Sequence, residues 1–260
     1  MTSLHIKTVG QGEPLVMLHG WGMHSGLWQE FAMQLASAYQ VTLVDLPGHG
    51  YSKALDQYSM TRVIAELVHT LPEPAVWLGW SMGGAIVLEL SQQHPELIKG
   101  ILLVCSNPKY SRTSDWPHAM KVAVLNAFAR AVRENDQITL ARFTGLMTQG
   151  EGEQARQILR FVRKRLPQAP PANRNALLWG LDVLQNGDFR SIFKHTVHPM
   201  RVLLGEDDPL IPCQVAHELA SLNQDADIHV LKNAGHVPFL SQQARMVDDV
   251  SAFMQRLETA

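Results

Sequence analysis

The stretch Ala75-Val76-Trp77-Leu78-Gly79-Trp80-Ser81-Met82-Gly83-Gly84-Ala85 decides how this chain folds. An apolar run typical of a buried strand leads into Gly-Trp-Ser-Met-Gly, and the residues that follow favour a helix. Glycines on both sides of the serine let backbone segments pass closely, and the serine stands exposed at the edge of a sheet. We therefore expect Ser81 to be a nucleophile. The amide of Met82, at the helix start, is expected to face the oxygen that becomes negative during attack.

The pentapeptide Gly-x-Ser-x-Gly is a weak signal alone, because a turn of small residues with an idle serine would look the same. A nucleophilic serine needs a base and an acid that orients the base. Around this kind of turn they follow in the order serine, acid, histidine. The predicted strand 201–204 runs into Gly205-Glu206-Asp207-Asp208-Pro209, and the predicted strand 228–231 is followed by Asn233-Ala234-Gly235-His236. Both partners are thus expected on loops at the carboxyl ends of strands.

Several residues compete for these two roles, since the chain has 12 histidines and three adjacent acids in the acid loop. Position favours His236 as the base, whereas His19, in the turn after a buried strand, is expected to support its own loop. Asp208 is preferred as the acid because of its distance from Gly205. Asp207 and Glu206 remain alternatives.

Strands alternate with helices in the first part of the chain. Polar and apolar residues alternate over 4–9, which predicts an edge strand, and continuous apolar runs predict buried strands at 14–18, 41–45, 75–78 and 99–105. Helices are expected over 59–71 and 82–94. Strand-type sequence returns at 200–204 and 228–231, with helices expected over 213–222 and 241–257. This alternation indicates an α/β protein with a mostly parallel, doubly wound sheet.

Residues 108–190 contain no convincing strand. Helical periodicity predicts helices over 118–133, 136–148, 152–166 and 173–186. We interpret 108–190 as a helical cap inserted into a core made of 1–107 and 191–260. The cap carries 13 Lys and Arg against 7 Asp and Glu, a net charge of +6, whereas the remainder carries −8. Such a field steers acidic partners, although ordinary solvated helix faces could carry the same charges.

Composition and missing motifs exclude several classes of protein. With 260 residues, 46% hydrophobic and 18% charged, the chain can form one α/β domain with an insertion. It has no apolar run of the roughly 18 to 20 residues that cross a bilayer and no basic-then-apolar leader, so we expect a cytoplasmic protein without membrane binding. No motif for a metal, a nucleotide cofactor or nucleic acid is present. Cys105 and Cys213 are expected to be buried or idle thiols.

Taken together, the motifs resemble those of the α/β-hydrolase superfamily over nearly the whole chain. The resemblance rests on His19-Gly20-Trp21-Gly22, on the loop from Asp45 to Ser52, on the turn around Ser81, on the acid loop and on Gly235-His236. Within the superfamily, the chain is most similar to the carboxylesterases that hydrolyse pimeloyl-ACP methyl ester in biotin synthesis. That similarity lies in Trp77-Leu-Gly-Trp-Ser-Met-Gly-Gly, Asp115-Trp116-Pro117, Arg142-Phe143 and Ala155-Arg156-Gln157.

The resemblance implies an α/β-hydrolase fold and a monomeric serine esterase without metal or cofactor. Ser81 would be the nucleophile, His236 the general base and Asp208 its orienting acid. The backbone amides of Trp21 and Met82 would form the oxyanion hole.

The resemblance also assigns residues in the cap. Phe143, Thr144, Gly145, Leu146 and Met147 match the segment that lines the family's acyl-chain channel, although a helix packed on the sheet would also explain them. Arg142, Arg156 and Arg160 match arginines that hold the acidic acyl carrier protein. Ile138 stands where another arginine is expected, so the carrier contacts are expected to differ there.

Other functions share much of this pattern. A short-chain carboxylesterase of broad specificity, or a C–C bond hydrolase of the same superfamily, would have the same catalytic residues and a different cap. A non-catalytic ligand receptor is an alternative from another class, against which an apparently complete triad argues. Dehalogenases and epoxide hydrolases need a carboxylate at the position of Ser81 and are excluded.

Overall fold

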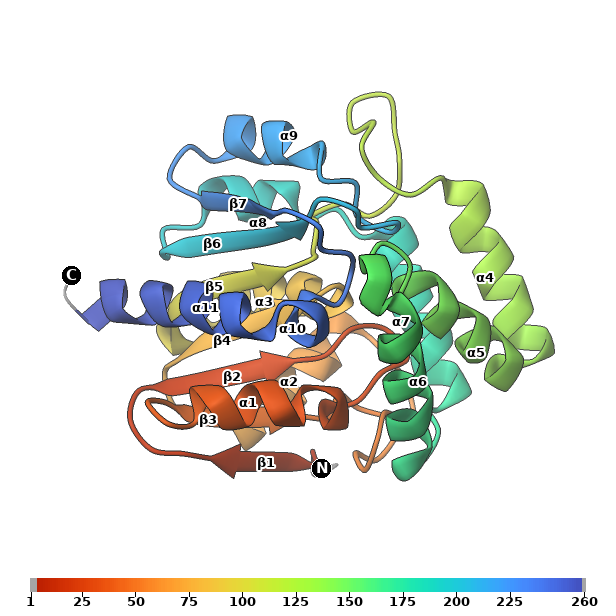
Figure 1. Cartoon of the computed structure of the whole chain (residues 1–260), viewed down its shortest axis with the longest axis horizontal. Coiled ribbons are helices and arrows are strands. Elements are labelled where there is room, and N and C mark those ends of the chain that lie inside the picture. Colours follow the sequence, from red (N-terminus) through yellow and green to blue (C-terminus); the bar gives the residue numbers. More distant parts are fainter. Residues whose placement is uncertain (1–3, 259–260) are drawn as a thin grey trace.

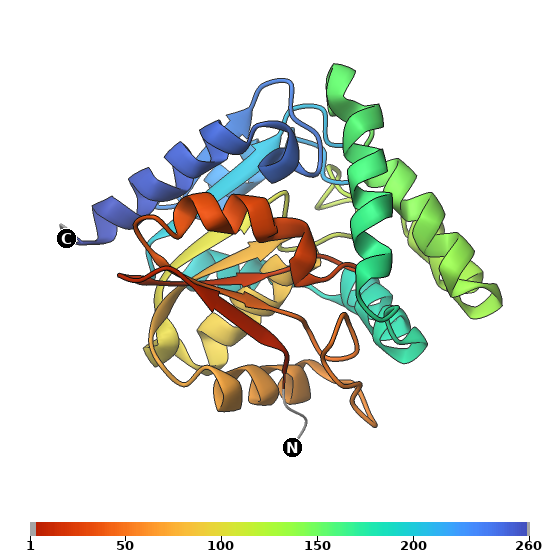
Figure 2. The ribbon, with the colours of Figure 1, turned by 60° about the horizontal axis from the view of Figure 1, so that its bottom comes forward.

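A single sheet runs through the part of the chain that the computed structural model describes, residues 4–258 (Figures 1 and 2). Its strands are β1 (Ile6–Val9), β2 (Pro14–Leu18), β3 (Gln40–Val44), β4 (Ala75–Trp80), β5 (Ile98–Val104), β6 (Met200–Gly205) and β7 (Asp227–Leu231). They lie in the order β1-β3-β2-β4-β5-β6-β7. Only β1 pairs antiparallel, with β3. The prediction of a mostly parallel sheet is therefore confirmed.

Helices cover both faces of the sheet. They are α1 (Gln29–Leu35), α2 (Met60–Thr70), α3 (Met82–Gln93), α8 (Arg190–His195), α9 (Val215–Leu222), α10 (Pro238–Ser241) and α11 (Gln243–Glu258). Figure 1 shows α1 and α11 on the near face, where they contact each other, whereas α2, α3 and α8 lie behind the sheet. Every residue of β4, the middle strand, is buried. A strand covered on both faces reads as a continuous apolar run, as β4 does.

Four helices of 11 to 13 residues follow β5 and precede β6 along the chain, and they lie at the carboxyl ends of the parallel strands (Figure 1). They are α4 (Val122–Glu134), α5 (Asp136–Met147), α6 (Ala155–Arg165) and α7 (Arg174–Asn186). Contacts join α4 to α7 and α5 to α6, while α7 also contacts α3 of the core. At the base of the insertion, the Phe189 amide donates to the Pro108 carbonyl oxygen at 2.8 Å. The two ends of this region thus lie side by side.

Short 3-10 helices complete the chain at η1 (Ser25–Trp28), η2 (Pro95–Leu97), η3 (Gly152–Gln154) and η4 (Leu166–Gln168). None of the helices in residues 4–258 is long and apolar enough to cross a membrane.

Most predicted elements lie within about three residues of the observed bounds, and three features differ more from the sequence-based expectation. Helix α4 begins at Val122, not at 118, because the preceding residues form a bridged loop in which Ser111 pairs with Met120. Helix α8 was not predicted, since six residues are too few to show a helical period. The helix predicted over 241–257 begins at Gln243, because the backbone of Gln242 (φ −127°, ψ 47°) is not helical, and the short helix α10 that precedes it was not predicted.

His19 supports its loop as expected. Its Nε2 accepts a hydrogen bond from the Leu46 amide at 3.0 Å, so it joins the loop after β2 to the loop after β3. Burial, with a smaller contribution from neighbouring His49, lowers the pKa of His19 to about 3. Burial likewise lowers the pKa of His49 to about 4. Both imidazoles are therefore neutral at pH 7.

These two histidines predict a pH-dependent stability. In the unfolded chain an imidazole titrates near pH 6.5, so below that pH the unfolded chain binds protons that the folded protein does not. We expect the free energy of unfolding to fall as the pH is lowered from about 6.5 to 4, by at most about 1.4 kcal/mol per pH unit for each histidine. Urea denaturation across this range measures it.

The matched variant is His49→Asn, whose side-chain amide can still donate to the Pro47 carbonyl oxygen that His49 Nδ1 contacts at 3.2 Å. The free energy of unfolding of this variant should depend less steeply on pH, because its unfolding takes up about one proton fewer in this range. A wild-type stability that stays constant between about pH 6.5 and 5 would contradict this account.

Candidate active site

Ser81 occupies the turn between β4 and α3 in a conformation that residues with side chains rarely adopt, with φ 54° and ψ −122°. Such strain costs about 1–3 kcal/mol and persists where the surroundings enforce it. The Ser81 carbonyl oxygen accepts hydrogen bonds from the Gly84 amide at 2.9 Å and the Ser106 hydroxyl at 2.9 Å. The hydroxyl of Tyr110 donates to the same oxygen at 2.5 Å. These donors hold the strained turn in place.

The glycines of the turn are required by close contacts. A β-carbon on Gly79 would lie 2.5 Å from Cα of Gly84, and one on Gly83 would lie 2.4 Å from the Leu18 carbonyl oxygen. Any side chain at either position would force strand and helix apart. The predicted strand, sharp turn and helix around Ser81 are thus confirmed as geometry.

His236 and Asp208 form a buried pair. The Nδ1 of His236 lies 2.8 Å from Oδ2 of Asp208, on the loops after β7 and β6. The other carboxylate oxygen of Asp208 accepts the amides of Leu210 at 2.8 Å and Ile211 at 3.0 Å. Since a carboxylate only accepts, the imidazole carries its proton on Nδ1 and a lone pair on Nε2.

The pair stands beside the turn that holds Ser81. Trp80, the residue before the serine, donates its indole N–H to the His236 carbonyl oxygen at 2.8 Å. The Nε2 of His236 is buried and has no hydrogen-bond partner among residues 4–258, the Ser81 hydroxyl included. A serine–histidine hydrogen bond is often long without substrate and tightens when substrate binds. The arrangement can support proton transfer from a serine hydroxyl to an imidazole.

Geometry separates the three candidate acids. Asp208 is buried and bonded to His236, whereas Asp207 and Glu206 are exposed. The Glu206 carboxylate instead accepts the Asn233 amide at 3.1 Å. Of the three, only Asp208 contacts the histidine.

The loop after β2 lies directly against the serine. A β-carbon on Gly20 would be 3.1 Å from the Ser81 β-carbon, which places the next residue, Trp21, at the nucleophile. The Trp21 indole donates to the Leu177 carbonyl oxygen on α7 at 2.8 Å. In the part of the chain that the structure describes, the backbone amides of Trp21 and Met82 donate to no protein acceptor. Both amides are therefore available to a substrate oxygen.

With this geometry established, comparison with protein-family models finds a match over residues 15–249 to the alpha/beta hydrolase family. The chain belongs to this family. Curated relatives extend the match. A pimeloyl-[acyl-carrier protein] methyl ester esterase of Methylococcus capsulatus is 36% identical over 251 residues, covering 96% of this chain and 98% of the relative. A second esterase of the same name, from Nitrosomonas europaea, is 37% identical over 244 residues, covering 93% of this chain and 95% of the relative.

Solved structures agree on the fold. An esterase from Exiguobacterium antarcticum superposes with a TM-score of 0.87 at 20% identity, covering 98% of this chain and 96% of that one. The expectation of an α/β-hydrolase fold is thereby confirmed.

In this hydrolase, the residues predicted to line an acyl channel lie on α5 with different exposures. Phe143, Thr144 and Met147 are buried, and Gly145 and Leu146 are partly exposed. The Phe143 ring packs edge-on against Trp21, with centroids 4.9 Å apart. The α5 segment therefore reaches the loop that carries the Trp21 amide.

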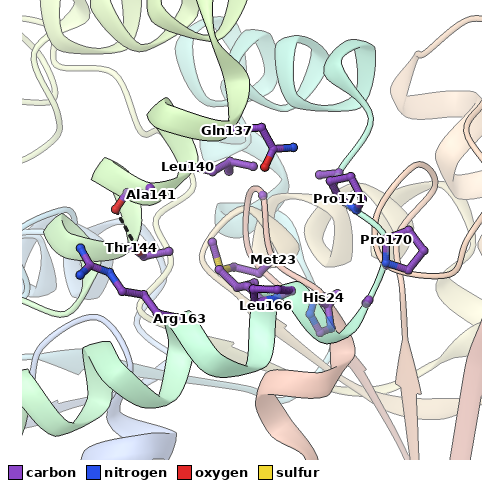
Figure 3. A pocket seen from close by; sticks show the side chains of 15 residues that line it. Met23, His24, Gln137, Leu140, Ala141, Thr144, Arg163, Leu166, Pro170 and Pro171 are labelled. Carbon is purple, nitrogen blue, oxygen red and sulfur yellow. Dashed lines mark hydrogen bonds between the residues drawn. The ribbon is translucent and has the colours of Figure 1, made fainter.

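A cavity of about 350 Å³ lies beside the contact between α5 and the loop after β2 (Figure 3). Met23 and His24 line it on the core side, and Leu140 and Thr144 line it on α5; the chain from Leu166 to Ala172 closes the remaining side. Its lining is largely apolar, as in small-molecule sites. The cavity adjoins Trp21 through Gly22, and Ser81 is not among its lining residues.

The three predicted carrier-contacting arginines are on the outside. Arg142 lies on α5, and Arg156 and Arg160 lie one turn apart on α6. All three are exposed, and none forms an ion pair with another described residue. Ile138, on α5, is 51% exposed. These helices therefore present unneutralised positive charge together with an apolar side chain.

Sequence reasoning missed three residues that shape this site. Tyr110 and Ser106 bond the Ser81 carbonyl oxygen, and burial raises the pKa of Tyr110, so its hydroxyl stays a donor. Glu151, between α5 and η3, is buried at 3% exposure beside the His236 loop. No local signal marks them, since their partners lie 25 to 86 residues away.

Cys105 also lies next to Asp208 and His236. Its Sγ and ligand atoms of Asp208 and His236 lie within 4.8 Å of one another. Burial raises the pKa of this thiol well above its usual value, and the charges of Asp208 and Glu151 raise it further. Cys105 is therefore a neutral thiol and does not compete with Ser81 as a nucleophile.

The pairing of Asp208 with His236 predicts unequal effects of two neighbouring substitutions. Asp208→Asn removes the acceptor for the Nδ1 proton and favours the wrong tautomer, so kcat for p-nitrophenyl acetate should fall about 10³- to 10⁴-fold. Asp207→Asn, one residue earlier and exposed, is the matched control and should retain kcat within about twofold. Equal losses in both variants would show that the acid was assigned wrongly.

Proposed function

We propose that this protein is a cytoplasmic, monomeric serine carboxylesterase that hydrolyses pimeloyl-ACP methyl ester to pimeloyl-ACP and methanol, a step of biotin synthesis. The observation that carries the proposal is the set of relatives named pimeloyl-[acyl-carrier protein] methyl ester esterase, which match nearly the full chain at 31–37% identity. The described geometry supports it, because a serine, an imidazole and a carboxylate converge from one chain at the carboxyl edge of the sheet.

The proposed reaction has two halves. The Ser81 hydroxyl attacks the methyl ester carbonyl while His236 Nε2 takes the hydroxyl proton, and Asp208 stabilises the imidazolium. The amides of Trp21 and Met82 bind the oxyanion; one such donor is worth about 2.7–4 kcal/mol of barrier. The imidazolium then protonates the departing methoxide. Water, deprotonated by His236, then attacks the acyl carbonyl; the imidazolium returns the proton to Ser81 Oγ as the serine–acyl bond breaks, which releases pimeloyl-ACP as the free acid.

The cap, residues 108–190, has two roles in this proposal. Its inner side takes the acyl chain: Phe143 packs on Trp21, and Thr144 lines the adjoining apolar cavity. Its outer side binds the carrier. The three exposed arginines Arg142, Arg156 and Arg160 belong to a region of net charge +6. Complementary charge of this kind speeds encounter with an acidic protein and orients it.

The deciding experiment measures methanol release from pimeloyl-ACP methyl ester by the wild type and by Ser81→Ala. We expect the wild type to turn over and the variant to lose about 10⁴-fold or more in kcat, because the nucleophile is gone. Circular dichroism checks that the variant is folded.

Three other outcomes point elsewhere. Cleavage of p-nitrophenyl acetate without methanol release from the carrier ester would indicate a broad-specificity esterase. Acyl-carrier binding without hydrolysis of either ester would indicate a non-catalytic receptor. Full activity of Ser81→Ala would move the nucleophile to another residue.

The carrier surface predicts a substrate-dependent effect of charge reversal. Arg142→Glu, Arg156→Glu or Arg160→Glu should raise KM for pimeloyl-ACP methyl ester about 3- to 10-fold, because an attraction becomes a repulsion. KM for p-nitrophenyl acetate should stay unchanged. The matched control is Arg62→Glu on α2, an exposed arginine of the core, and the difference should shrink at high salt. Equal losses on both substrates would indicate a folding defect instead.

A further inference from the structure

A carboxylate from the cap lies against the loop that carries His236. Glu151 belongs to the connection between α5 and η3, and it is only 3% exposed. Its Oε1 accepts the Val237 amide at 2.8 Å, and its Oε2 accepts the Gly235 amide at 3.1 Å. These two amides belong to the residues on either side of His236. One side chain therefore binds the backbone both before and after the imidazole.

The fit around this contact is close. A β-carbon on Gly235 would lie 2.7 Å from Glu151 Oε1 and 2.8 Å from the Gln149 carbonyl oxygen. A β-carbon on Gly150 would lie 2.0 Å from the carbonyl oxygen of Asp207, in the acid loop. The segment Gln149–Glu151 thus packs against the acid loop and the histidine loop together. Movement of this segment would disturb both partners of the serine.

The burial of Glu151 calls for an explanation beyond packing. A buried carboxylate is costly unless hydrogen bonds compensate it. Among residues 4–258 Glu151 forms no ion pair, and its carboxylate accepts hydrogen bonds from the two amides alone. A connection between two helices could expose its acid to water, as the neighbouring Glu153 does. The Glu151 carboxylate is instead turned to the amides on either side of His236.

We propose that Glu151 is a positioning residue for the catalytic base: a carboxylate supplied by the cap clamps the amides flanking His236 and so holds the imidazole between Asp208 and Ser81. This inference rests on the role of His236 in the proposed function. The Trp80 indole fixes the carbonyl oxygen of His236, and the Cys105 thiol contacts the carbonyl oxygen of Gly235 at 3.5 Å. The Trp80 indole and the Cys105 thiol contact only carbonyl oxygens of the loop, whereas Glu151 accepts hydrogen bonds from its amides.

The test substitutes Glu151→Gln, which keeps the size of the side chain but replaces one acceptor oxygen by a donor that opposes an amide N–H. A displacement of about 1 Å at a catalytic group can cost about 10²-fold. We therefore expect kcat for p-nitrophenyl acetate to fall about 10- to 100-fold with KM within about twofold. Glu153→Gln, two residues later and exposed, is the matched control and should match the wild type.

A second readout separates this inference from the proposed function. A fluorophosphonate probe reacts with an activated serine whatever the natural substrate is. Ser81 should be labelled about 10- to 100-fold more slowly in Glu151→Gln than in the wild type or Glu153→Gln. A wild type that is not labelled would defeat the proposed serine mechanism. A wild type that is labelled at the same rate as a folded Glu151→Gln would overturn the role of Glu151 alone.

A shorter acid provides the second variant in case Glu151→Gln does not fold. Glu151→Asp keeps the charge and both acceptor oxygens, but it is one methylene shorter and cannot reach both amides with the loop in place. Its kcat and labelling rate should fall at least threefold with KM unchanged. Wild-type values in folded Glu151→Asp would overturn the proposal.

Discussion

The strained backbone of Ser81 is the constraint on which the rest of the structure depends. Its positive φ is maintained in a crowded turn, where Gly79 lets β4 approach α3 and Gly83 lets α3 approach the end of β2 within distances that no side chain would allow. The Ser81 carbonyl oxygen accepts three hydrogen bonds, from the hydroxyls of Ser106 and Tyr110 and from the Gly84 amide at the start of α3. Residues immediately after β5 therefore have to supply donors to the turn after β4. The strain is confined to Ser81, but the two hydroxyls that help to maintain it come from the segment after the neighbouring strand β5.

Much of the fold and part of the site were predictable because the controlling forces act over short stretches. Strands buried on both faces have continuous apolar sequences, so β2 to β5 and the parallel sheet were expected correctly. His236 and the acid loop were predictable because the carboxyl ends of adjacent parallel strands meet at one edge. Asp208 was preferred on loop spacing, and the structure supports it through the bond to His236 and the exposure of Asp207.

Other features depend on contacts that no local pattern records. Glu151 occurs in a Gly-Glu-Gly connection that reads as an exposed turn, and its burial follows from amides that lie 84 and 86 residues later. The start of α4 was misplaced because the loop before it is held by pairing of Ser111 with Met120, not by helical periodicity. The positive charge of the cap, in contrast, could be predicted from composition alone. The structure adds that Arg142, Arg156 and Arg160 are exposed.

The attachment at Glu151 has a mechanical consequence for the cap. The bond between Phe189 and Pro108 joins the two ends of the insertion, and a lid held only there would swing about that single hinge. Glu151 attaches the middle of the insertion to the core at a second place, between α5 and α6. Other bonds join the insertion to the core as well: the Trp21 indole donates to the Leu177 carbonyl oxygen on α7 at 2.8 Å, and the Asn173 amide donates to the Gly48 carbonyl oxygen at 2.7 Å. Lifting the insertion as one rigid lid would therefore break several hydrogen bonds at once, including the two that hold the loop of His236, so the position of the imidazole depends on the insertion staying closed.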